Sequence, residues 1–97
     1  MMSAMKAMVV AVGLLAATPA DAMTGLEFLQ AFDKGGAAQA EALQPLVRQF
    51  VREGYHNVPD WADLAYMARA LILEKGYRDK PMAEIAREAA IANGMSK

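Results

Sequence analysis

The chain has 97 residues, a net charge of −1 and no cysteine, and 56% of its residues are hydrophobic. This length allows one small domain. The absence of cysteine excludes disulfides, a thiolate nucleophile, a cysteine metal site and a lipoprotein anchor. Charges of both signs alternate along the chain without a basic stripe, so we expect no nucleic-acid partner.

Residues 1–22 have the pattern of an export signal. Lys6 supplies a positive charge, residues 7–17 form an uninterrupted apolar run, and residues 20–22 (ADA) form a small-x-small cleavage site. This order is typical of a secretory signal peptide, and the run is shorter than the roughly 20 apolar residues that a membrane span needs. We therefore expect a periplasmic or secreted protein that begins at Met23 and has no stable membrane insertion. The alternative is a small membrane-associated envelope protein that keeps this segment as an uncleaved anchor.

Residues 23–97 predict an all-α domain, a small bundle of three to four helices. Four segments carry apolar residues at helical spacing, and none alternates with the period of two that is typical of a strand. In the first segment, Thr24 and Glu27 fit a capping box, in which each residue's side chain accepts a hydrogen bond from the other's backbone amide. Leu26, Leu29 and Phe32 follow at helical spacing, and Gly35-Gly36 is expected to end the helix.

The second helix is expected between Ala37 and Glu53. Its apolar stripe consists of Leu43, Leu46, Val47, Phe50 and Val51. Pro45 lies inside this segment, where a proline removes a backbone donor and clashes with the preceding turn. Either the helix is kinked or broken there, which we favour, or a short turn over residues 37–43 precedes a new helix with Pro45 in its first turn.

The third segment has the longest apolar stripe. Asp60 is expected to cap its N-terminus and Gly76 to end it. The stripe consists of Trp61, Leu64, Ala65, Ala68, Leu71 and Ile72. We expect it to be buried with Phe50 as the energetic centre of the fold.

A fourth helix is expected to begin with Pro81 in its first turn and Asp79 or Lys80 as its cap. Asn93-Gly94 is expected to end it. Its expected inward-facing residues are Met82, Ile85, Ala86, Ala89 and Ala92.

No catalytic, cofactor-binding or metal-binding residue can be assigned from the sequence, and we expect no enzyme activity. His56 is the only histidine, and it lies in a segment, residues 55–59, that ends in a proline and predicts a loop. Zinc sites need three or four ligands. Ser96 is the only serine after residue 22, so a serine-histidine-carboxylate arrangement is not supported. We expect His56 to be exposed or to stabilise its loop.

Protein binding is the function class that remains. A domain of about 75 residues without disulfides has a small core and often depends on oligomerisation. Large amphipathic side chains dominate protein interfaces. The interface candidates are Phe28, Tyr66 and Met67, which lie off the predicted stripes, together with Trp61 and Tyr77. We expect a protein partner or a homo-oligomer.

The chain also resembles the Tai family, exported periplasmic immunity proteins that neutralise amidase effectors of type VI secretion. The opening segment 24–29 is similar to the family's first helix. The segments 58–77 and 81–91 are similar to its closing pair, a long apolar helix and an alanine-rich helix. The resemblance implies an all-helical immunity-like inhibitor of a secreted effector. Family members commonly carry cysteines that this chain lacks, and no contact residue can be carried over.

Overall fold

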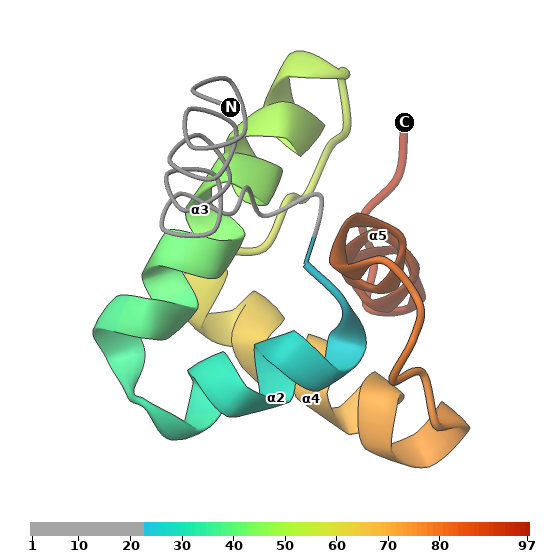
Figure 1. The fold of residues 1–97 in the computed structure, drawn as a ribbon. Helices are drawn as coiled ribbons and strands as arrows, with labels where there is room; N and C mark the ends of the chain where they lie inside the picture. The colour runs from blue at the N-terminus through green and yellow to red at the C-terminus, as the bar shows by residue number, and fades with distance from the viewer. Residues whose placement is uncertain (1–22) are drawn as a thin grey trace, which may run out of the picture.

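The computed structural model describes residues 23–97, and the predicted signal peptide lies outside the described residues. Four helices make up the described part of the chain. They are α2 (Gly25–Asp33), α3 (Gly36–Arg52), α4 (Trp61–Lys75) and α5 (Met82–Ala92) (Figure 1). Residues 23–97 contain no strand, only two isolated β-bridges. The predicted all-α fold is confirmed.

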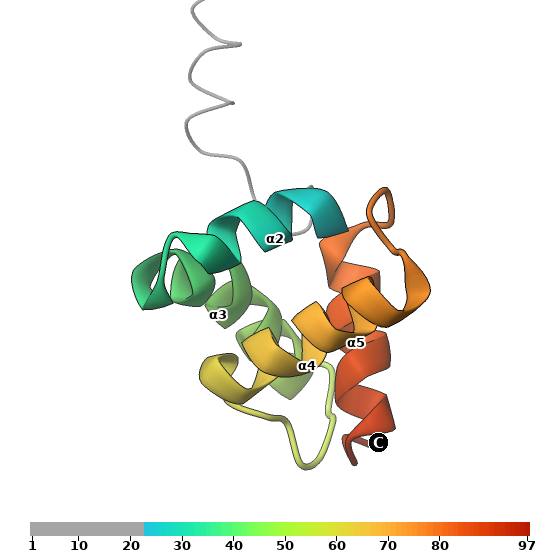
Figure 2. The ribbon, with the colours of Figure 1, turned by 90° about the horizontal axis from the view of Figure 1, so that it is seen from below.

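Helix α4 is the centre of the bundle, because it makes the two most extensive helix–helix contacts, with α5 and with α3. Figure 2 shows α3 on one side of α4, α5 on the other, and α2 lying across them. The two ends of α2 are fixed differently. At its start, the backbone amide of Gly25 donates to the carbonyl oxygen of Lys80 at 3.0 Å. At its end, only Lys34 and Gly35 separate it from α3.

The core is made of apolar side chains from all four helices and from the C-terminal segment. Its largest fully buried members are Phe28, Phe50, Leu43, Leu46, Leu64, Ile72, Met82, Ile85 and Met95. No polar or charged residue among residues 23–97 is buried. Hydrophobic burial therefore provides the main stabilisation, at about 1.5–3 kcal/mol for each fully buried large side chain.

The predicted caps of the first and third helices are confirmed. The Thr24 hydroxyl accepts from the amide of Glu27 at 3.3 Å, and the Glu27 carboxylate accepts from the amide of Thr24 at 2.8 Å. The Asp60 carboxylate accepts from the amide of Asp63 at 2.8 Å. Gly76 ends α4 in the left-handed conformation, with φ of 70°. These local signals set the helix boundaries that the sequence predicts.

Pro45 does not break the second helix, which runs without interruption from Gly36 to Arg52. A break, and the alternative of a separate short turn before a new helix, are therefore both wrong, whereas a kink at Pro45 stays a prediction. The proline leaves the carbonyl of Glu41, four residues earlier, without its helical donor. Both Pro45 and Glu41 are exposed, so water can satisfy that carbonyl.

The start of the fourth helix also differs from the prediction. Pro81 is the N-cap residue, in an extended conformation with ψ of 137°, and α5 begins at Met82. Tertiary pairing is the reason. Thr24 forms an isolated β-bridge with Pro81, and the amide of Met82 donates to the carbonyl of Met23 at 2.6 Å. The cap is therefore held by the strand-like segment before α2 and not by Asp79 or Lys80.

Four inward-facing assignments on α3, α4 and α5 need correction. Val51 is 59% exposed, because it lies off the buried face of α3 that Leu43, Leu46 and Phe50 form. Trp61 and Leu71 are only partly buried, although both pack against the core. Ala92 is exposed, whereas Ala90 is buried. Helix α5 packs on α4 and also touches α2, so it has neighbours on more than one side. Its buried face is therefore wider than one stripe and is rotated from the predicted face.

Candidate protein-binding surface

The five predicted interface residues occupy different environments. Phe28 is fully buried, at 0% exposure, so its placement off the core stripe is wrong. Trp61, Met67 and Tyr77 are partly buried and pack against the core. Tyr66 is 68% exposed. Tyr66 is therefore the only one of the five whose side chain lies mostly in solvent.

Tyr66 is held by an aromatic contact with α2. Its ring meets the ring of Phe32 edge to face, with centroids 5.4 Å apart and an interplanar angle of 82°. The guanidinium carbon of Arg69, one turn along α4, lies 5.1 Å from the centroid of the same Phe32 ring. Phe32 in turn packs against buried Phe28 at 6.2 Å. An exposed tyrosine and an arginine are thus both anchored on one ring that is itself fixed to the core.

The apolar surface continues along α4. Tyr66, Ala70 and Leu73 are spaced by four and three residues, so they lie on one face of the helix. All three are exposed, Leu73 by 51%. We call these three residues the α4 outer face. Leu26 of α2, 41% exposed, adds to the exposed apolar surface of the chain.

A shallow cavity of about 230 Å³ adjoins the α4 outer face on the side of α5. Its lining consists of Met67, Ala70, Leu71, Glu74, Ala89, Ala92 and Asn93. Most of these side chains are small or apolar, with Glu74 and Asn93 as the polar members. The outer face and the cavity share Ala70, so they form one continuous surface.

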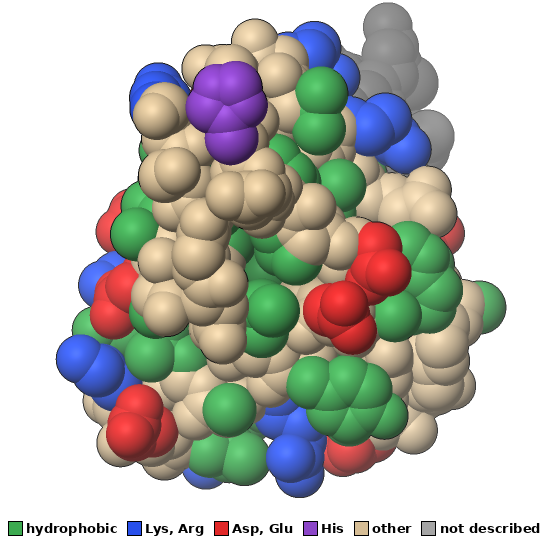
Figure 3. Space-filling view, turned by 180° about the vertical axis from the view of Figure 1, so that it is seen from behind, with side chains coloured by type: hydrophobic (Ala, Val, Ile, Leu, Met, Phe, Trp, Pro, Cys, Tyr) green, Lys and Arg blue, Asp and Glu red, His purple; other side chains and the backbone are tan. Residues whose placement is uncertain are grey.

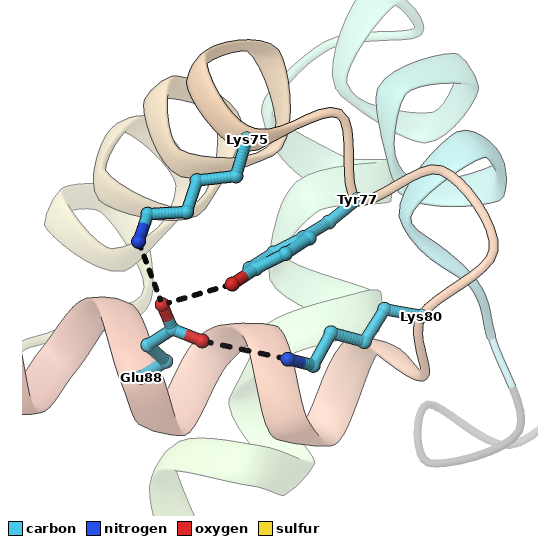
Figure 4. Close-up of polar contacts among 4 residues, drawn as sticks. All are labelled: Lys75, Tyr77, Lys80 and Glu88. Atoms are coloured by element: carbon cyan, nitrogen blue, oxygen red, sulfur yellow. Dashed lines mark hydrogen bonds and ion pairs between the residues drawn. The ribbon is translucent and has the colours of Figure 1, made fainter.

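Tyr77 has partners within the chain. Its hydroxyl donates to the carboxylate of Glu88 at 3.3 Å, and the Lys80 ammonium lies 4.2 Å from its ring centroid (Figure 4). Glu88 also pairs with Lys75 at 3.9 Å and with Lys80 at 3.6 Å. These contacts join the end of α4, the following connection and α5. These contacts give Tyr77 a structural role at this junction.

His56 is exposed, as Figure 3 shows for the single histidine of the chain. Its backbone pairs with Ser96, donating to the Ser96 carbonyl at 2.5 Å and accepting from the Ser96 amide at 3.1 Å. This pairing holds the loop between α3 and α4 against the C-terminal segment. Within residues 23–97, no three histidine, cysteine or acidic side chains are grouped as a metal site requires.

Sequence reasoning missed Phe32, Arg69, Ala70 and Leu73 as parts of this surface. The spacing of Tyr66, Ala70 and Leu73 opposite the core stripe is a signal that identifies the α4 outer face without a structure. The contacts of Phe32 with Tyr66 and Arg69 have no such signal, because they depend on how α2 packs across α4.

In the part of the chain that the structure describes, no helix is both long and apolar enough to cross a membrane. Comparison with known proteins gives no match to a protein-family model, to a curated protein or to a solved structure.

Proposed function

We propose that this protein is an exported, non-enzymatic binding module that contacts a protein partner through the α4 outer face. One observation carries the proposal. Tyr66 is 68% exposed and is nevertheless held by edge-to-face contact with Phe32. A large ring that is fixed in position and faces solvent has the properties of an interface anchor.

Pre-organisation is the physical basis of the proposal. Ordering a side chain on binding costs about 0.5–1.5 kcal/mol. Tyr66 and Arg69 are residue types that dominate binding hot spots, and Phe32 positions both of them before any partner arrives. Leu73 adds exposed apolar area one turn beyond Ala70. A partner that covers this face gains hydrophobic burial without having to order the anchor.

A narrower form of the proposal is an immunity-like inhibitor that works in the periplasm or outside the cell. It is supported by the signal-like pattern of residues 1–22 and by the resemblance of the opening and closing helices to the Tai family. In this form the partner is a secreted effector. Co-expression with an effector encoded beside this gene tests it. An inhibitor should restore the growth of cells that its own effector would otherwise stop.

Photo-crosslinking tests the general proposal. We would replace Tyr66 with the photoreactive residue p-benzoylphenylalanine in the source cells, and replace Val51 in a matched control. Val51 is 59% exposed and apolar but lies on α3. We expect a defined protein adduct from position 66 and none from position 51.

The adduct must then be identified and its binding measured with purified proteins. We expect Tyr66→Ala to weaken that binding at least tenfold, which corresponds to about 1.4 kcal/mol. Equal adducts from both positions, or no protein adduct from position 66, would contradict the proposal.

A further inference from the structure

We propose that the partner of the α4 outer face is a second copy of this chain, bound with the two α4 helices antiparallel and crossing at Ala70. This inference rests on the proposed function and names the occupant of its surface. It follows from the order of residues along α4, from the charges at the two ends of that helix, and from the size of Ala70.

The order of residues makes the face complementary to itself. A two-fold axis at Ala70 places Ala70 opposite its own copy. It also places Tyr66 of each chain beside Leu73 of the other, since the two residues lie four positions before and three positions after the axis. Both are exposed, by 68% and 51%. The contact is isologous, so it closes as a dimer and does not extend into a filament.

Charges at the ends of α4 favour the antiparallel direction. Asp63 lies in the first turn of the helix and Arg78 lies just after its end, and both are exposed. Asp63 lies seven positions before Ala70, and Arg78 lies eight positions after it, beyond the C-cap Gly76, so the two charges flank the crossing point at nearly equal separations along the chain. Antiparallel pairing brings Asp63 of one copy beside Arg78 of the other at both ends. Parallel pairing would instead place like charges together.

Ala70 allows a close approach at the crossing point. Helix axes pack 8–10 Å apart, and small residues permit the shorter distance. Because Cα atoms lie about 2.3 Å from the helix axis, the two Ala70 Cα atoms would be about 3.4–5.4 Å apart. That range overlaps the 4.4–6.8 Å that separates the Cα atoms of two disulfide-bonded cysteines.

The size of the face indicates a weak dimer. A contact along one helix is smaller than a standard interface and belongs to the class below about 1,200 Å² of total buried surface, which is typical of weak association. We therefore expect a dissociation constant in the micromolar range. Sedimentation equilibrium of the purified protein should show a monomer–dimer equilibrium, with Tyr66→Ala raising the dissociation constant at least tenfold.

Cysteine trapping tests the crossing point directly. The chain has no cysteine, so any disulfide in a single-cysteine variant joins two copies. We would compare Ala70→Cys with Val51→Cys, an exposed position on α3, in the same redox buffer and at the same concentration. We expect at least tenfold faster formation of covalent dimer at position 70. Circular dichroism checks that both variants remain helical.

A charge exchange tests the direction. Asp63→Arg and Arg78→Asp should each weaken the dimer, and the double variant should restore it. A double variant as weak as the single variants would overturn the antiparallel arrangement. Equal trapping at positions 70 and 51, with a parent protein that is monomeric at every concentration, would overturn the dimer itself. An adduct from position 66 to a different protein would then still support the proposed function.

Discussion

Gly25 packs directly against the backbone carbonyl of Tyr77. A Cβ atom on Gly25 would lie 1.9 Å from that oxygen and 3.0 Å from Cδ1 of Ile85. This contact occurs where α2 begins against the connection between α4 and α5, and the amide of Leu26 also donates to the carbonyl of Arg78 there, at 2.9 Å. The first residue of α2 must therefore be small so that the two segments can hydrogen-bond.

Gly25→Ala should destabilise the fold by about 1–3 kcal/mol, because the obstructing atom belongs to the backbone and cannot rotate away. Gly36→Ala is the matched control. Its Cβ would lie 3.7 Å from the Trp61 ring, an ordinary contact, and it should stabilise α3 by about 0.4–1 kcal/mol. Urea denaturation of both variants measures the difference. Effects of the same sign would contradict the close packing at Gly25.

Phe28→Ala should reduce the free energy of unfolding by about 3–5 kcal/mol, since the side chain is fully buried. Tyr66→Ala should cost about 1 kcal/mol, the size of one aromatic pair, because that side chain is mostly exposed. Thermal melting at low protein concentration separates these intrinsic effects from binding. If Tyr66→Ala unfolded the protein as Phe28→Ala does, Tyr66 would be a core residue and not a binding anchor.

Alanine substitutions at two adjacent positions on α4 should differ in their effect on the free energy of unfolding. Ile72 is 1% exposed, and Ile72→Ala should cost about 2–5 kcal/mol. Leu71 is only partly buried and lines the shallow cavity beside α5, so Leu71→Ala should cost less than Ile72→Ala. Chemical denaturation of the two variants gives the ranking. The reverse order would show that the buried face of α4 is rotated from its place in this structure.

The pKa of Glu53 is lowered by hydrogen bonds from Gln49 at 2.9 Å and from Arg87 at 2.7 Å. The folded state then holds a proton on Glu53 less tightly than the unfolded state does. Its contribution to stability is present above the ordinary pKa of 4.5 and is lost as the pH falls through the lower, folded value. Glu53→Gln should therefore reduce the difference between the melting temperatures at pH 6 and pH 3. An unchanged difference would mean that this ion pair has no effect on stability.

We expect signal cleavage between Ala22 and Met23. Met23 is itself part of the described fold, because its carbonyl accepts a hydrogen bond from the amide of Met82 at 2.6 Å. The intact mass of the exported protein tests this prediction. A mass that includes residues 1–22 would favour the membrane-anchored alternative.

Features that depend on a few neighbouring residues could be predicted from the sequence. The capping box of Thr24, the Asp60 cap and the Gly76 terminus are confirmed because each is decided within one helical turn. Burial on α2 could not be predicted in the same way. Leu26, in the predicted stripe, is 41% exposed, whereas Phe28 beside it is fully buried. The packing of α2 across three other helices decides which side faces inward.

The packing of Met95 and the aromatic contact of Tyr66 could not be predicted from the sequence either. Met95 lies beyond the last helix, and the turn at Gly94, with φ of 111°, returns it to the core. No helical period extends to it. The position of Tyr66 off the main stripe correctly indicates exposure, but its contact with Phe32 joins residues 34 positions apart.

The pairing of His56 with Ser96 also bears on the order of folding. Met95 is 2% exposed, and Ser96 closes a β-bridge to a loop 40 positions earlier in the chain. The core therefore cannot be completed until the chain has been synthesised past residue 96, whatever helices form earlier. A chain in which Met95 has not yet packed lacks one of its largest buried side chains, so the helices that form first stay less stable until this segment docks.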